Sequence, residues 1–166
     1  EAIAGRPKAE KIARDLGVPT WDTRHASAAF RITRPFATTV LANRLAFWRT
    51  EELGIRLQPG IDEVSLALIA DAWSRTYRSG VSTIAGSSEP IESLSGLRLI
   101  PDQTGAEVAA DHIVSTFPNR PPAVALDLTL AAIATRYGES TTDVVAMQLE
   151  YPRAPKNVDA RGAGTN

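Results

Sequence analysis

Apolar residues recur at helical spacing along most of the chain. This periodicity predicts helices over residues 6–17, 35–53, 61–77, 106–117, 122–137 and 140–149. Gly17 and Gly54 follow the first two helices as residues suited to end them. Asp62 is placed to cap the third helix, and residues 140–143 resemble a capping box at the start of the last one.

Short segments of alternating or β-branched residues lie between these helices. They predict strands over residues 55–57, 81–85, 90–93 and 97–100, bounded by proline, glycine and serine. Residues 153–166 contain little apolar material and are expected to form a flexible tail. The chain is therefore predicted to be an α/β protein, rich in helix and with a short sheet.

The same pattern indicates which side chains fill the core. The helix over residues 61–77 is expected to turn three residues inward, Val64, Leu68 and Ala72. Large aromatic side chains at helical spacing are core or interface anchors. We expect Phe36 and Trp73 in the core, and Phe47 and Trp48 at an interface.

The composition excludes several kinds of site. The 166 residues include no cysteine and two histidines, so no disulfide, no thiolate chemistry, no metal site and no cofactor are expected. The formal net charge of -1 gives no general attraction to nucleic acid or anionic membranes. No apolar run reaches the roughly 18 residues that a spanning helix needs. The absence of cysteine does not fix the compartment, and the cytoplasm is slightly favoured.

One segment has the appearance of a helix-turn-helix. Residues 9–18 form a helix with small inward residues and a glycine at the turn, and a second helix within residues 19–30 would present Arg24 and His25 to DNA. An amphipathic helix that simply ends at glycine is far commoner. DNA binding is therefore kept as an alternative only, and nucleic acid is not the favoured partner.

No catalytic site is visible in the sequence. Serines, His25 and His112 are present, but no Gly-x-Ser-x-Gly elbow occurs. Residues 86–90 follow a predicted strand as phosphate loops do, yet Glu89 would repel an anion and Pro90 lacks an amide donor. The residues of this chain alone therefore leave catalysis uncertain and favour a protein that is not an enzyme.

A longer block resembles a known family. An acidic turn at residues 60–64 opens a helix, residues 81–86 read Val-Ser-Thr-Ile-Ala-Gly, and residues 97–102 end in Pro-Asp. These segments resemble the opening of the DJ-1/PfpI family, and residues 144–152 resemble the closing helix of its regulator-type members. The resemblance implies a partial, degenerate flavodoxin-like α/β sandwich of the class I glutamine amidotransferase-like superfamily.

The resemblance also implies a domain organisation. Residues 1–54 would be the end of a preceding DJ-1-like unit, and residues 55–152 a degenerate unit. The family's nucleophile is a cysteine on a strand-to-helix elbow, and this chain has none. The family's pocket carboxylate falls on Ser65.

The implied role is a non-catalytic structural or ligand-sensing segment of a larger protein, such as a transcription regulator. Its partners would be a second copy or an upstream domain of the same protein. The alternative is an isocyanide hydratase or amidotransferase-like enzyme whose cysteine lies upstream, with this chain supplying pocket walls. In either case a small-molecule ligand is expected beside Asp62, Glu63 and Ser65.

Overall fold

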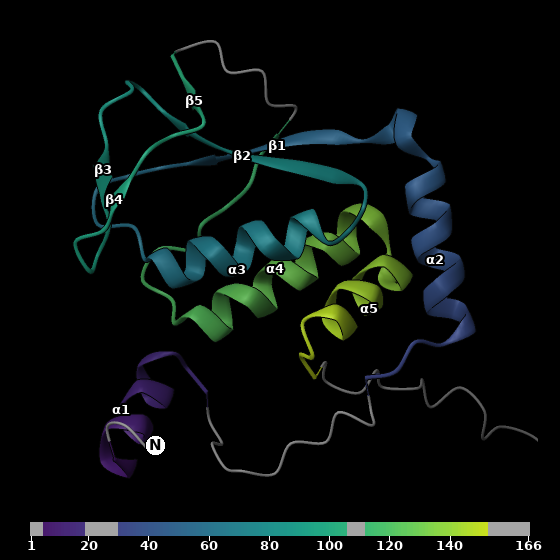
Figure 1. Ribbon diagram of the computed structural model, residues 1–166, viewed down its shortest axis with the longest axis horizontal. Coiled ribbons are helices and arrows are strands. Elements are labelled where there is room, and N and C mark those ends of the chain that lie inside the picture. The colour runs from purple at the N-terminus through teal and green to yellow at the C-terminus, as the bar shows by residue number, and fades with distance from the viewer. Residues whose placement is uncertain (1–4, 19–29, 106–111, 153–166) are drawn as a thin grey trace, which may run out of the picture.

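A four-stranded parallel sheet with helices packed against it forms the body of the computed structural model, which describes residues 5–18, 30–105 and 112–152 (Figure 1). The helices are α1 (Arg6–Asp15), α2 (Arg34–Leu45), the 3-10 helix η2 (Phe47–Arg49), α3 (Glu63–Ser74), α4 (Pro122–Tyr137) and α5 (Glu139–Gln148). The strands are β1 (Glu51–Arg56), β2 (Ser79–Ala85), β3 (Ile91–Glu92), β4 (Arg98–Leu99), β5 (Gln103–Thr104) and β6 (His112–Ile113). This architecture confirms the predicted helix-rich α/β class with a short sheet.

The sheet is built around β1, in the order β5-β2-β1-β6 with every pair parallel. β1 pairs with β2 in the register Leu53 to Val81. Leu53 and Ile55 are both buried and join the core beneath the helices. A separate antiparallel hairpin, β3 with β4, follows β2.

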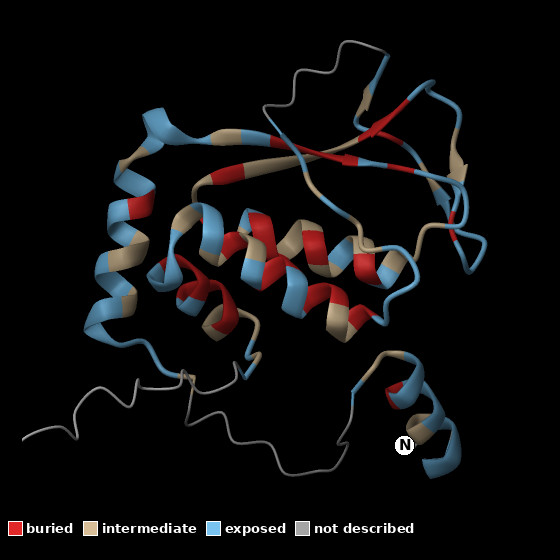
Figure 2. Ribbon diagram, turned by 180° about the vertical axis from the view of Figure 1, so that it is seen from behind, coloured by how far each residue is buried: buried red, intermediate tan, exposed pale blue. Residues whose placement is uncertain are grey.

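Helices α3, α4 and α5 lie on one side of the sheet, with α2 beside its end (Figure 1). Their buried positions face the sheet and one another (Figure 2). Ile69, Trp73 and Ile133 are almost completely buried there, and each such side chain stabilises the fold by about 1.5–3 kcal/mol. None of the helices within the described ranges combines the length and apolar character that a bilayer crossing requires.

Helix α2 is held to the body by one buried polar side chain. The Asn43 amide donates to the Thr76 carbonyl at 2.9 Å and to the Thr141 hydroxyl at 3.1 Å. These bonds tie α2 to the turn before β2 and to α5. The outer face of α2 stays exposed, including Leu41 and Leu45.

Helix α1 meets α4 end to end. The Leu16 carbonyl, just past α1, accepts a hydrogen bond from the Ala123 amide in the first turn of α4 at 2.9 Å. No side chain caps α4, so this carbonyl satisfies an amide that would otherwise lack a partner. Gly17 has φ +77 and lies against Pro121, as a helix-ending glycine requires.

The predicted helix over residues 35–53 is wrong in its second half. The helix ends at Leu45, and residues 51–56 form β1, the central strand. Gly54 lies inside that strand instead of ending a helix. Residue 54, where the sequence suggested a division of the chain, therefore lies within the sheet. That residues 1–54 are the end of a preceding DJ-1-like unit stays a prediction.

The helix predicted over residues 106–117 is also wrong where it can be compared. Residues 106–111 lie outside the described residues, as do residues 153–166 of the predicted tail, but His112–Ile113 forms β6 beside β1. The β-branched residues at 113 and 114 favour an extended backbone once β1 offers a pairing edge. The strands predicted near residues 81–85, 90–93 and 97–100 are confirmed.

Three smaller expectations also fail. Val64 is exposed, and Ser65 and Ile69 are buried in its place, although Ala72 is buried as predicted. Phe36 is half-buried and not in the core, whereas Trp73 is a core residue. Helix α5 begins at Glu139 after Gly138 with no side-chain cap, so Ser140, the first residue of the expected capping box, lies inside the helix instead of capping it.

Candidate functional site

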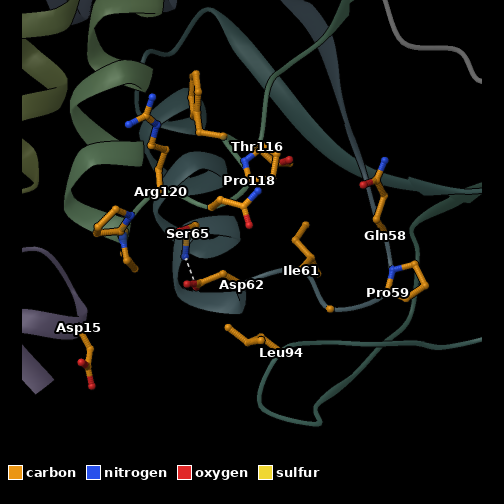
Figure 3. Close-up of a pocket in the computed structure, with 15 residues that line it drawn as sticks. Asp15, Gln58, Pro59, Ile61, Asp62, Ser65, Leu94, Thr116, Pro118 and Arg120 are labelled. Carbon is orange, nitrogen blue, oxygen red and sulfur yellow. Dashed lines mark hydrogen bonds between the residues drawn. The ribbon is translucent and has the colours of Figure 1, made fainter.

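A cavity of about 520 Å³ lies outside the carboxyl ends of β1 and β6 (Figure 3). Its walls come from the turn between β1 and α3, the loop between β6 and α4, the tip of the β3–β4 hairpin and the end of α1. Open parallel sheets take their ligands at the carboxyl ends of the strands, near the point where the strand order reverses. Here the sheet extends in both directions from β1, so the cavity lies at that point.

The start of α3 forms the floor of the cavity. Asp62 caps the helix, its carboxylate accepting from the Val64 amide at 2.8 Å and the Ser65 amide at 2.9 Å. These bonds satisfy two of the amides that a helix start leaves unpaired. The carboxylate also keeps the helix start negative, so it does not favour an anion at this position.

Ser65 supplies an unused hydrogen-bonding group. Its side chain is 4% exposed, lines the cavity, and its Oγ has no hydrogen-bond partner. A buried hydroxyl left without a partner costs free energy, because the bonds that it makes to water in the unfolded chain are not replaced. A ligand group that bonded to this oxygen would remove that cost. Figure 3 shows Ser65 beside Asp62, with Leu94 and Pro118 around them.

The loop opposite α3 has an unusual backbone. Phe117 has φ 50 and Asn119 has φ 63, so two non-glycine residues in three adopt the left-handed conformation. Such conformations persist where the surrounding structure holds them, and they concentrate at binding sites. Pro121 and Pro122 fix the chain after the loop, and Arg120 adds a cationic side chain to the lining.

Two of the three ligand-binding residues predicted from the sequence lie at the cavity. Asp62 and Ser65 line the cavity, but Glu63 does not. The Glu63 carboxylate instead accepts a hydrogen bond from the Ser95 hydroxyl in the β3–β4 hairpin, which lowers its pKa. A ligand role for these residues stays a prediction. Arg24 and His25, the DNA-binding alternative, lie outside the described residues.

The sequence analysis did not predict several of the residues that line the cavity. Asp15, Leu94, Phe117, Asn119 and Arg120 come from three separate parts of the chain that meet only in the folded protein. The Asn-Arg-Pro-Pro run at residues 119–122 is typical of a turn, but nothing in it shows what the turn faces. No group of three or more acidic or histidine side chains converges as metal ligands within the described ranges.

No family model matches the sequence, and no curated protein matches it at a significant level. Two solved structures are similar in fold. The crystal structure of an AraC family transcriptional regulator from Pseudomonas putida has a TM-score of 0.50 and 12% identity, covering 60% of this chain and 99% of that one. Oxidised DJ-1 from Toxoplasma gondii has a TM-score of 0.49 and 12% identity, covering 62% and 100%. The predicted fold class is confirmed, and at this identity the likeness extends to the fold alone.

Proposed function

We propose that this chain is a non-catalytic, ligand-sensing segment of a larger protein, and that it binds a small molecule in the cavity between α3 and the loop of residues 114–121. The observation that supports this most directly is the Ser65 hydroxyl, buried in the cavity wall without a partner. The volume of about 520 Å³ is in the usual range for small-molecule sites.

The lining indicates the kind of ligand. Proline and other apolar side chains form much of the wall, including Pro59, Pro118 and Leu94. Asp15 and Asp62 set two carboxylates against one guanidinium, that of Arg120. A small, uncharged or cationic molecule with an apolar body and one group that bonds to Ser65 fits this surface best.

A sensing role agrees with the chemistry that the chain offers. It has no cysteine, and the cavity lining includes no histidine. A serine without a neighbouring base is a weak nucleophile. The fold that it shares with an AraC family regulator is compatible with a regulatory segment. The enzyme alternative would require a nucleophile supplied from outside this chain.

The test is a screen of small molecules by thermal unfolding and calorimetry. A ligand present at 100 times its Kd should stabilise the fold by about 2.7 kcal/mol, which raises Tm by several degrees for a chain of this size. Ser65→Ala should weaken binding about fivefold or more, because one hydrogen bond is lost. Ser88→Ala, an exposed serine outside the cavity, is the matched control and should bind normally.

Two results would overturn the proposal. One is a hit that binds wild type and Ser65→Ala equally, which would place the ligand elsewhere. The other is turnover of an aldehyde or isocyanide by the purified chain, abolished by changing one of its own side chains. Turnover would favour an enzyme over a sensor.

A further inference from the structure

A second cavity, of about 450 Å³, lies at the opposite end of the sheet. Trp48, Arg49, Thr50, Glu51, Arg78 and His112 line it. It shares no residue with the cavity at the carboxyl ends of the strands. It is open to solvent and lies where β1 and β2 begin.

The one glutamate in this lining, Glu51, already has a positively charged partner outside the lining. The Glu51 carboxylate accepts from Arg136 Nε at 2.6 Å and from the Tyr137 hydroxyl at 2.7 Å. Burial raises the pKa of Glu51, but these two hydrogen bonds outweigh it and hold the pKa below its ordinary value. Glu51 therefore stays ionised and paired with Arg136, and it leaves the other cations of the cavity without a counter-charge.

The Arg78 side chain is held in place, but its Nε lacks a hydrogen-bond partner. Its guanidinium lies over the Tyr137 ring, 5.0 Å from the ring centre. Its Nε is buried and bonds to nothing. A buried guanidinium donor without an acceptor is costly, as for any buried polar group. The stacking fixes the orientation of the guanidinium without using its donors.

Arg49 supplies a second free cation. It belongs to η2, and neither Arg49 nor Arg78 forms an ion pair with another described residue. Two guanidinium groups that face one cavity match an oxyanion, because each can donate two parallel N–H bonds to it. The Thr50 hydroxyl and the His112 ring add polar groups to the same lining.

We propose that this cavity binds the phosphate group of a small phosphate monoester. Arg49 and Arg78 hold the phosphate oxygens, and Trp48 packs against the rest of the molecule. Trp48 lines the cavity and is 71% exposed. Its ring contacts Phe47 edge to face, with the ring centres 5.3 Å apart, and most of its remaining surface is open to a ligand. The site is independent of the small-molecule cavity near Ser65, so either can fail without the other.

The experiment titrates the whole chain with phenyl phosphate and with inorganic phosphate, by calorimetry and tryptophan fluorescence at low salt. Both should bind, and phenyl phosphate should bind more tightly because its ring covers Trp48. Arg49→Gln should weaken phosphate binding about tenfold or more. Trp48→Ala should reduce the advantage of phenyl phosphate and leave the affinity for inorganic phosphate unchanged.

The control variant is Arg98→Gln, an exposed arginine on β4 outside both cavities, which should bind as wild type does. Arg49 is exposed, so its replacement leaves the fold intact, and an unchanged Tm verifies this. The proposal is overturned if neither phosphate binds at millimolar concentration, or if Arg49→Gln and Arg98→Gln weaken binding equally. It is also overturned if an oligonucleotide binds far more tightly than phenyl phosphate, because the partner would then be a nucleic acid.

Discussion

The two ends of the sheet differ in how buried side chains near them are hydrogen-bonded. Where the strands begin, such groups are mutually bonded: Asn43 bonds to Thr76 and Thr141, and the Ser79 hydroxyl donates to the Trp73 carbonyl at 2.8 Å. Where β1 and β6 end, Ser65 Oγ is buried without a partner. The beginning of the sheet is therefore arranged for stability, with Arg78 as its exception.

The backbone shows the same contrast. At the carboxyl end, Phe117 and Asn119 hold left-handed conformations, which cost free energy in non-glycine residues. Backbone strain of this kind persists only where the surrounding structure holds it. We therefore expect substitutions at the two ends to differ sharply in their effect on stability.

The largest effect should come from Asn43→Ala. The change leaves the Thr76 carbonyl and the Thr141 hydroxyl without their donor in a buried place, and we expect a loss of about 2 kcal/mol in the free energy of unfolding. Asn119→Gly is the counterpart at the other end. Glycine accepts its φ of 63, so stability should change by less than about 0.5 kcal/mol. Urea unfolding of both variants measures the difference, and equal losses would contradict the contrast.

A second pair of variants tests whether α1 forms part of the cavity wall. Gly17 and Gly60 both have φ +77, so alanine costs about 1–2 kcal/mol at either position. At Gly17 the added Cβ would also lie 2.7 Å from Pro121 Cβ, whereas at Gly60 it meets nothing within 4 Å. Only Gly17→Ala should push α1 away from α4. Hydrogen exchange at the Ala123 amide should then be at least about tenfold faster in Gly17→Ala alone.

Glu51→Gln should show a smaller effect that depends on pH. The folded pKa of Glu51 lies below its ordinary 4.5, so its stabilising contribution is complete above that value and is lost as the pH falls through the lowered pKa. We expect a loss of about 1 kcal/mol at pH 7, which shrinks towards zero in acid. Urea midpoints between pH 3 and 7 measure this, with the exposed Glu89→Gln as control. A loss that stayed constant with pH would show that the pair with Arg136 does not form.

Much of the fold could be predicted because its determinants are local. The Asp62 cap, the strand at residues 81–85 and the helix of α4 follow from neighbouring residues alone, and the structure confirms them. The two failures of element type share one cause. Gly54 was interpreted as a helix end and residues 112–117 as helix, but pairing with other strands decides both.

The candidate site was less predictable for the same reason. Asp62 and Ser65 were found through a family resemblance, which located one wall of the cavity. The opposite wall, with Phe117 and Arg120, is separated from it by more than fifty residues of chain. Nothing local marks Arg49 and Arg78 as neighbours either, since β1 and β2 bring them together only through their pairing.

The smallest effect is the sharpest test of the contrast. Ser65→Ala removes a buried hydroxyl that bonds to nothing and keeps the Ser65 amide bonded to Asp62, so stability should stay within about 0.5 kcal/mol or rise slightly. Ser79→Ala removes a hydroxyl of similar burial that donates to the Trp73 carbonyl, and it should cost about 1 kcal/mol. The two free energies of unfolding, measured in the same buffer, isolate hydrogen bonding from burial. If Ser65→Ala lost as much as Ser79→Ala, the Ser65 hydroxyl would already have a partner in the free protein, and the cavity would hold no unused group for a ligand.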